Sequence, residues 1–575
     1  MRRILKYMKG YGKECVLGPL FKLLEASFEL MIPLVVAQIV DVGIAAGDRG
    51  HIIKMCLVMG LLGVVGLASA VTAQYFAAKA AVGFAVRLRE ALMGKLLKLR
   101  CTQIDGLGTS AMITRMTSDV NQIQNGVNLT LRLLLRSPFV VFGAMVMAFT
   151  IDGESALIFA AAIGLLCVIV FGIMLITMPM YKKVQNRLDG VTGAVRENLE
   201  GVRVLRAFCK EEQEKAEFDS RTRFLQKAQI VTGRIASLMN PVTLVIINLA
   251  VVVLLYTGAI KVQGGILTQG LVVALYNYMS QILVELIKMA NLIITITKAA
   301  ACGKRVGDVL EIETDETENR EGSYTLRGEV EFRNVTARYH EGADAALENI
   351  SFQALPGQTV GIIGGTGAGK STLVNLISGL YTASEGQVLL DGKDITHWAG
   401  RALRQSIGTV PQKAVLFRGT LRDNLLWGRE EATDERLWQA LKLAQAEEIA
   451  RSKEGLDTPV EQGGRNFSGG QRQRLTIARA LVRQPKILIL DDSASALDYA
   501  TDARLRQSIR SIPDTPTTFI VSQRAASVRH ADLILVLDDG RLVDRGTHAQ
   551  LMERCDIYQE IYYSQFRKEV AGNAQ

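Results

Sequence analysis

The fold of the second half of this chain is decided by one stretch, Gly364-Gly365-Thr366-Gly367-Ala368-Gly369-Lys370-Ser371-Thr372. It fits the pattern G-x-x-x-x-G-K-[ST], with a strand-like apolar run before it (359–363) and a helix-like run after it (373–377). The glycines let backbone N–H groups surround phosphates at the positive end of the helix dipole. Lys370 then reaches the β- and γ-phosphates, and the Ser371 hydroxyl is a ligand for Mg²⁺. We therefore expect a site for ATP and Mg²⁺.

Length and composition predict a membrane half followed by a soluble half. The chain has 575 residues, 49% of them apolar, and a mean hydropathy of +0.20. The apolar residues concentrate in the first 300 positions, and an acidic, polar stretch follows. We expect a membrane domain over 1–302, a linker over 303–328, an α/β domain over 329–567 and a disordered tail over 568–575.

The net charge of +9 fits a membrane protein with Lys and Arg on its cytosolic side. We expect no nucleic-acid partner, because no basic tract is interleaved with aromatic residues. The seven cysteines are scattered without a C-x-x-C pair, so we expect reduced thiols and neither a disulfide framework nor a cysteine metal site.

Six apolar segments are long enough to cross a lipid bilayer, which takes about 20 residues. They run roughly over 16–40, 53–78, 129–150, 155–178, 238–261 and 268–296. The two long connections, 79–128 and 180–235, are basic, and the second holds twelve Lys and Arg. This bias predicts a multi-pass protein of the cell membrane with both termini and the soluble domain in the cytoplasm. The external side is nearly bare, which argues against a receptor.

Few Gly and Pro and a helical spacing of apolar residues indicate that the long connections are helices continuing past the membrane. Their expected tips lie at 105–108 and 210–215, which either dock on a soluble domain or are solvated. The basic N-terminus, 1–13, is expected to be an amphipathic helix on the membrane surface.

Four ionisable residues stand out in the membrane segments: Glu25, Glu29, Glu285 and Lys288. Glu25 and Glu29 are one helical turn apart and share a face. Such residues face a bundle interior or a wet cavity, so Glu25, Glu29 and Glu285 are candidates to bind a cationic substrate or couple protons. The alternative is pairing between helices, or between Glu285 and Lys288 at i,i+3.

The soluble half carries two more elements suited to nucleotide chemistry. The apolar run 486–490 ends in Asp491, a carboxylate suited to Mg²⁺. Phe467-Ser468-Gly469-Gly470-Gln471 opens an Arg-rich helix, 472–483, whose first turn offers free N–H groups to an anion.

The order of these pieces resembles the ATPase domain of an ABC transporter: Tyr339, the Gly364–Ser371 loop, Gln412, Ser468-Gly469-Gly470-Gln471, Asp491 and Ser495-Ala496-Leu497-Asp498. The six apolar segments resemble the membrane half of an ABC exporter, and 196–208 is similar to that family's second cytosolic loop. The resemblance covers nearly the whole chain. It implies a multidomain fold: an all-α six-helix transmembrane domain (type I exporter, type IV ABC) followed by an α/β P-loop ABC-type ATPase domain.

The resemblance also implies roles. Tyr339 would stack on adenine, although an ordinary strand tyrosine is the alternative. Ser371, Gln412 and Asp491 would hold Mg²⁺. The signature (residues 468–471) would close on ATP bound by a second ATPase domain, with the loop 495–498 contacting across the same interface. One half alone is present, so a second half-transporter is required.

Two departures from the family pattern lie beside the phosphate loop. Asp492 stands where the family has the glutamate that activates water, and Gln523 stands where it has a histidine that contacts the γ-phosphate. Asp is one methylene shorter, and Gln is never a cation at neutral pH. Gln462 also stands where the family often has a glutamate.

We therefore expect the site on this chain's own loop to bind ATP and hydrolyse it poorly, while the signature completes a competent site on a partner. This pattern resembles the degenerate-site subunit of heterodimeric bacterial multidrug-type exporters. Their substrates would be amphipathic small molecules such as drugs, lipids or peptides. The alternatives are a slow homodimer, an ATP-gated channel or regulatory subunit, and an importer on an exporter fold.

Overall fold

The computed structural model describes residues 4–314, 326–339, 342–398, 400–493 and 495–566. It forms two compact units: residues 1–97 with 110–312, and residues 98–109 with 313–575. Residues 315–325 of the expected linker and the whole of the expected tail lie outside the described residues. The two units are described separately below.

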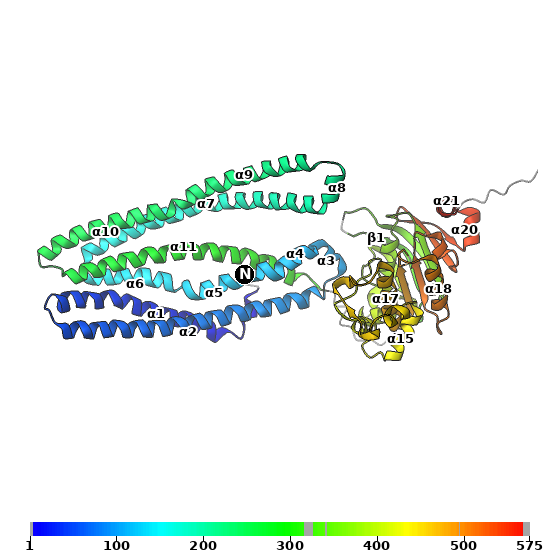
Figure 1. Ribbon diagram of the computed structural model, residues 1–575, viewed down its shortest axis with the longest axis horizontal. Coiled ribbons are helices and arrows are strands. Elements are labelled where there is room, and N and C mark those ends of the chain that lie inside the picture. Colours follow the sequence, from blue (N-terminus) through cyan, green and yellow to red (C-terminus); the bar gives the residue numbers. More distant parts are fainter. Residues whose placement is uncertain (1–3, 315–325, 340–341, 399, 494, 567–575) are drawn as a thin grey trace, which may run out of the picture. The chain divides into compact units, whose positions relative to one another are not determined.

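The first unit contains six helices long and apolar enough to cross a membrane, one for each expected segment. They extend well beyond the apolar cores (Figure 1). Three of these spans are single helices: α2 (Arg49–Leu96), α7 (Gly153–Glu200) and α11 (Gln269–Glu311). The others are built from consecutive pieces: α1 (Gly12–Gln38) with η2 (Ile39–Ile44); α4 (Thr109–Thr114), η3 (Arg115–Asp119), α5 (Val120–Leu133) and α6 (Arg136–Ile151); and α9 (Glu211–Ser237) with α10 (Met239–Gln263).

Helix α11 is the central element of this unit. It packs against α1, α5, α6 and α10, and the buried Tyr278 hydroxyl donates to the Leu30 carbonyl at 2.6 Å. The helix runs on to Glu311, through the first part of the stretch expected to be a linker.

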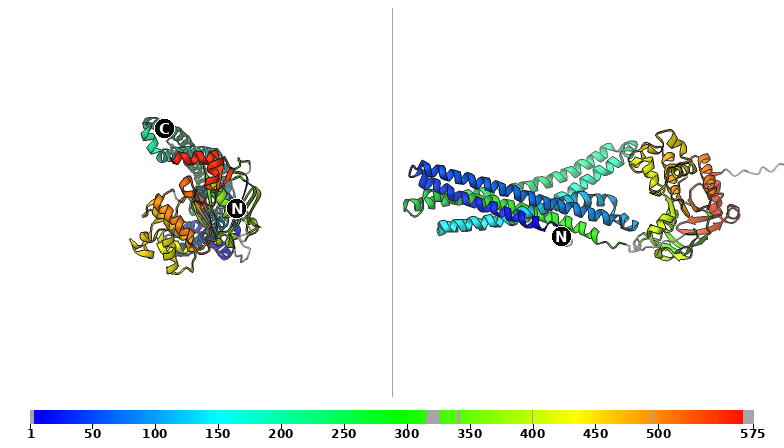
Figure 2. Two further views of the ribbon diagram at one scale, coloured as in Figure 1. Left: turned by 90° about the vertical axis from the view of Figure 1, so that its right-hand side faces the viewer. Right: turned by 90° about the horizontal axis from the view of Figure 1, so that it is seen from below.

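The long connections are helical, as predicted, and each turns at a short helix. One tip is α3 (Cys101–Leu107), which covers most of the expected position. The other is α8 (Val202–Ala207), so the expectation that 210–215 forms the tip is wrong. Lys210 instead precedes the first turn of α9, where three glutamates favour the helix N-terminus. Helices α7 and α9 lie side by side along this extension (Figure 2).

The N-terminal segment is not a separate surface helix, which corrects that expectation. Residues Leu5–Met8 form a single 3₁₀ turn, and Ile4 is 1% exposed in a cluster with residues of α2 and α11. The Arg87 guanidinium donates to the Lys9 carbonyl and fixes the segment against α2. The buried Ile4 side chain therefore anchors this segment to the helices of the unit.

The membrane charges are paired through an arginine that the sequence interpretation overlooked. Arg136 lies 2.5 Å from both Glu29 and Glu285, and Glu285 also contacts Lys288 at 2.8 Å. Arg136 opens α6, directly after the break that follows α5, and Pro138 in its first turn suits a helix start. The expected Glu285–Lys288 pair is confirmed.

The second unit is built on sheets that place its loops. A four-stranded sheet has the order β2-β1-β4-β5, and a six-stranded sheet has the order β12-β11-β3-β10-β9-β6. In the larger sheet only the β11–β12 pair is antiparallel. The strands are β1 (Val330–Ala337), β2 (Leu347–Ala354), β3 (Thr359–Gly364), β4 (Glu385–Leu390), β5 (Lys393–Asp394), β6 (Ile407–Val410), β9 (Ile487–Asp491), β10 (Thr517–Val521), β11 (Leu533–Asp538) and β12 (Arg541–Gly546).

Helices cover the larger sheet, and the chain between β6 and β9 is mainly helical (Figure 1). The continuous apolar runs of β3, β9 and β10 are buried throughout, as expected for strands covered on both faces. The helices are α12 (Lys370–Ile377), α13 (Gly400–Ser406), α14 (Leu421–Leu426), α15 (Asp434–Leu443), α16 (Glu447–Arg451), α17 (Gly469–Val482), α18 (Tyr499–Arg510), α19 (Ala525–Val528), α20 (His548–Arg554) and α21 (Asp556–Gln565).

A test of the membrane pairing follows from the burial of Glu285, which is 2% exposed. Arg136→Leu leaves this carboxylate without its main partner, and we expect a loss of about 3–5 kcal/mol of stability. Lys288→Gln is the control, because the Lys288 side chain is 42% exposed and contributes less. Thermal unfolding of the detergent-purified protein measures both. The double variant Arg136→Leu/Glu285→Leu should recover much of the lost stability. If Arg136→Leu and the control Lys288→Gln destabilise the protein equally, the proposed pairing is contradicted.

Candidate functional site

The phosphate loop joins β3 to α12 as the sequence predicts. Its glycines are needed for close approach and unusual backbone geometry. A Cβ on Gly364 would lie 2.0 Å from the Leu537 carbonyl oxygen, and Gly369 has a φ of +87° at the start of α12. Only glycine suits both positions without strain. The loop therefore reaches the start of α12 in a conformation that suits an anion at the helix N-terminus.

Lys370 and Ser371 are held ready by neighbouring groups. The Lys370 ammonium donates to the carbonyl oxygens of Gly364 at 3.0 Å and of Gly365 at 2.5 Å. The Ser371 hydroxyl donates to the Asp491 carboxylate at 3.1 Å. Burial lowers the pKa of Lys370, whereas the nearby carboxylates of Asp492 and Asp491 act to raise it. Burial likewise raises the pKa of Asp491, although the Ser371 hydrogen bond opposes it. A divalent cation and phosphates would relieve both desolvated charges.

Five segments meet in one pocket of about 350 Å³. They are the phosphate loop, the end of β9, the residue pair after β10, the segment after β6, and the described part of the connection between β1 and β2. All three expected Mg²⁺ ligands and both departures from the family pattern line this pocket: Ser371, Gln412, Asp491, Asp492 and Gln523. The donor set of one hydroxyl, one amide and one carboxylate fits Mg²⁺, which prefers oxygen ligands and shares them with substrate phosphates.

Asp492 has a left-handed backbone, with a φ of +46°. Three hydrogen bonds hold it there: its N–H donates to Val521, and its carbonyl accepts from the N–H and the hydroxyl of Ser495. Its carboxylate lies 3.4 Å from the Gln412 amide nitrogen. Asp is among the residues that tolerate this conformation, and such backbone outliers concentrate at functional sites.

Tyr339 lines the same pocket, as predicted for an adenine contact. Its hydroxyl lies 2.8 Å from the Thr372 hydroxyl, and its ring packs edge-on against Tyr381. The ring is 39% exposed, so one side remains available for stacking.

The signature residues lie at the start of α17 and do not line the nucleotide pocket. Ser468 accepts from the Gln471 N–H, and the Gln471 side chain accepts from the Ser468 N–H, so they form a capping box. A Cβ on Gly469 would meet no described atom within 4 Å, whereas one on Gly470 would lie 2.9 Å from the Ala496 carbonyl. Gly470 is therefore needed for packing, and Gly469 faces open space.

The loop Ser495–Asp498 leads into α18, where Asp498 caps the helix by accepting from the Thr501 N–H at 2.8 Å. This hydrogen bond, together with one from the Thr501 hydroxyl, lowers the pKa of Asp498. Arg524, next to Gln523, donates to the carbonyls of Leu497 at 3.1 Å and Ser495 at 3.0 Å. It ties the segment after β10 to the loop 495–498.

Arg524 and Gln565 are site residues that sequence reasoning missed. The Gln565 side chain donates to the Gln523 carbonyl at 2.7 Å and accepts from the Ala525 N–H at 2.8 Å. The position of Arg524 directly after Gln523 was a usable signal. Gln565 lies on α21, far along the chain, and no local pattern indicates its role.

A second pocket, of about 440 Å³, lies between α1 and α11 in the membrane unit. Of the three carboxylates expected in a cavity, Glu29 and Glu285 line this pocket. Glu25 does not line it and pairs with Lys22 at 2.5 Å. The polar lining consists of Glu29, Asn277, Ser280, Gln281, Glu285 and Lys288. With Arg136 included, two carboxylates face two cations, so the cluster is neutral.

Two family profiles match the two halves of the chain. The ABC transporter transmembrane region profile matches residues 15–286, and the ABC transporter profile matches residues 347–495. An ABC transporter ATP-binding protein of Bacillus subtilis (strain 168), YfiB, is 36% identical over 571 residues, with 99% of each chain covered. A fatty acid ABC transporter ATP-binding/permease protein of Mycobacterium bovis is 30% identical, covering 83% of this chain and 75% of its own.

Among solved structures, a bacterial Atm1-family ABC exporter with ATP bound is 25% identical. It superimposes with a TM-score of 0.81 and covers 98% of this chain and 99% of its own. The fold, the order of the motifs and these similarities agree. The chain therefore belongs to the ABC transporter family, as an ATP-driven half-transporter of the exporter type, with six membrane-spanning helices and a cytoplasmic ATPase domain.

Proposed function

We propose that this half-transporter works as the degenerate-site subunit of a heterodimeric exporter. The observation that carries the proposal is the combination of a complete ATP and Mg²⁺ pocket with Asp492 and Gln523 at its two catalytic positions. In this role the chain's own pocket retains ATP and contributes little to hydrolysis.

The chemistry at these two positions supports slow turnover. A general base must come within about 3 Å of the proton it accepts, and the Asp492 carboxylate is one methylene shorter than glutamate. Gln523 donates a hydrogen bond but carries no charge to stabilise the transferring phosphoryl group. Removing an acid or base costs a factor of about 10²–10⁴ in rate.

The signature supports the second half of the proposal. Gly469 has open space around it, and the capping box presents the first turn of α17 with free N–H groups. This surface is suited to close on ATP held by a partner that carries the glutamate and the histidine. The proposed partner is therefore a second, non-identical half-transporter.

The proposed substrates are amphipathic small molecules such as drugs, lipids or peptides. The pocket between α1 and α11 offers amide, hydroxyl and charged groups beside apolar ones, with no net charge. This balance disfavours a dedicated cation or proton site, because Arg136 and Lys288 together offset the charges of Glu29 and Glu285. The similarity to a mycobacterial fatty acid transporter is compatible with an amphipathic cargo.

The asymmetry between the two half-sites is testable with the reconstituted pair. Gly469→Asp places a carboxylate where the partner's ATP would lie, and we expect ATP hydrolysis to fall at least 100-fold. Asp492→Ala should lower it less than about threefold, since that position contributes little. Steady-state ATPase assays give both values, and circular dichroism checks that each variant is folded. The proposal fails if Asp492→Ala abolishes turnover while Gly469→Asp is tolerated.

A gain-of-function experiment distinguishes the degenerate site from a slow homodimer. Asp492→Glu with Gln523→His restores the longer base and the cationic contact, so we expect the purified chain alone to hydrolyse ATP at least tenfold faster. The same pair of changes combined with Lys370→Ala is the matched control and should remain inactive. Robust hydrolysis by the unaltered chain alone would instead favour the homodimer.

A further inference from the structure

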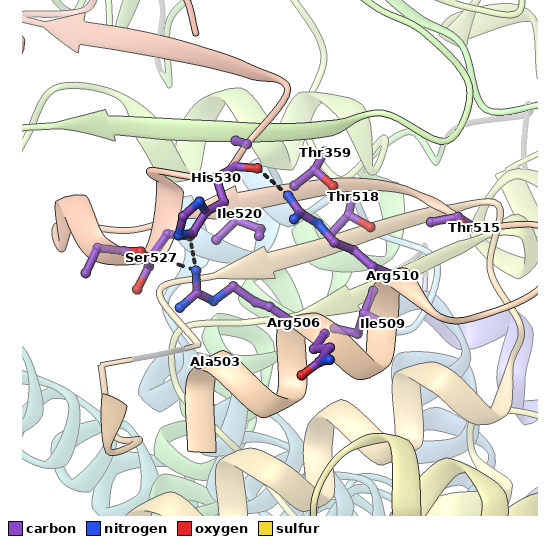
Figure 3. A pocket seen from close by; sticks show the side chains of 13 residues that line it. Thr359, Ala503, Arg506, Ile509, Arg510, Thr515, Thr518, Ile520, Ser527 and His530 are labelled. Atoms are coloured by element: carbon purple, nitrogen blue, oxygen red, sulfur yellow. Dashed lines mark hydrogen bonds between the residues drawn. The ribbon is translucent and has the colours of Figure 1, made fainter. Parts of the chain in front are cut away.

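A cationic pocket lies in the second unit, apart from the nucleotide pocket. It has a volume of about 260 Å³ and is lined by α18, α19, β10 and the segment that leads to β11. Arg506 and Arg510, one turn apart on α18, reach toward His530 (Figure 3). Apolar side chains, among them Ile509 and Ile520, form part of the wall. The volume is just below the usual range of about 300–1,000 Å³ for ligand pockets, so it suits a small molecule.

The two arginines have different roles. Arg506 is saturated: it pairs with Asp502 at 3.0 Å and donates to the carbonyls of Ala526 and Ser527, each at 3.2 Å. It thereby fastens α18 to α19. Arg510 donates one hydrogen bond, to the His530 carbonyl, and pairs with no carboxylate in the described part of the chain. Its remaining N–H groups are available to a ligand.

Positive charge in the pocket is not balanced. None of its lining residues is acidic. Burial lowers the pKa of His530, and Arg529, Arg506 and Arg510 lower it further. The other ionisable groups near this site are His548, Asp502, which is taken by Arg506, and Asp532, which accepts from the Thr359 N–H. An anion would relieve this repulsion and would be held by charge-assisted hydrogen bonds.

The pocket is linked through short backbone segments to the ATP-binding machinery. Helix α18 begins directly after the loop 495–498, and α19 begins two residues after Gln523. The Ser527 hydroxyl donates to Asp502 at 3.1 Å, a second bond between the two helices. Because His530 follows the end of α19 by two residues, a ligand that draws Arg510 and His530 together would act on α18 and on the segment directly after α19.

We propose that this pocket binds a small anion with a phosphate or carboxylate group, and that its occupancy alters ATP hydrolysis. The occupant carries at most a short apolar or hydroxylated body, given the volume and the walls. Nothing in this proposal depends on whether the transporter is a heterodimer.

Equilibrium dialysis of radiolabelled sulfate against the full-length protein tests the proposal. Saturating ATP and Mg²⁺ keep the phosphate loop occupied, and chloride keeps the ionic strength fixed. We expect saturable binding that Arg510→Gln weakens about tenfold or more. The matched control Arg451→Gln, an exposed arginine on α16 paired with Glu447, should leave binding unchanged. Competition by glycerol 3-phosphate and by succinate then separates phosphate from carboxylate ligands.

His530 gives a second, independent readout. An anion favours the imidazolium and raises its lowered pKa, so binding takes up a proton and tightens as the pH falls from 8 to 6. Sulfate keeps its charge over this range, so the ligand adds no pH dependence. His530→Gln should flatten the profile. Absent binding, or binding indifferent to both Arg510→Gln and His530→Gln, overturns the proposed site.

The regulatory part is tested by ATPase assays with and without sulfate. We expect at least a twofold change in rate for the unaltered protein and none for Arg510→Gln. A rate that sulfate leaves unchanged while it binds overturns the link to hydrolysis.

Discussion

The nucleotide site depends on one constraint, the parallel pairing of β3, β10, β9 and β6. Ile520 pairs with Gly361, Val521 with Asp491, and Val410 with Leu490, so all four strands end at the same edge of the sheet. This register places the pocket residues that follow β6, β9 and β10. Binding sites at the carboxyl ends of parallel strands are a general property of open α/β sheets. Here the same property gathers Gln412, Asp492 and Gln523 around the phosphate loop.

Two separate groups of residues in the second unit match the family's nucleotide motifs, the phosphate-loop pocket and the signature at the start of α17. The phosphate loop, Ser371 and Asp491 form a complete cradle, but the two positions that would drive hydrolysis hold a shorter acid and an uncharged amide. The signature at the start of α17 is complete and lies outside that cradle. Arg524 and Gln565 fix the segment carrying Gln523 from two sides.

In the membrane unit, ionisable residues of the helices are paired with one another. Arg136 pairs with both Glu29 and Glu285, and with Lys288 it makes the lining of the pocket between α1 and α11 neutral overall. Burying such a cluster requires that every member is paired, since an isolated charge at this depth costs several kcal/mol. The same arginine sits where α5 gives way to α6, so the break in the helix and the position of the charge occur together.

The sequence by itself determined the six spans and the phosphate loop with its strand and helix, because each rests on local periodicity or on residues within one short segment. It also revealed Asp492 and Gln523 as departures, since a substitution inside a motif is visible without coordinates. Only the tertiary structure decided that Arg136 pairs with Glu285, 149 positions away, that Ile4 is buried against α2 and α11, that Gln565 holds Gln523, and that Arg510 and His530 share a pocket. These contacts join residues far apart in the chain, and no local pattern encodes which distant side chains a fold brings within hydrogen-bond distance.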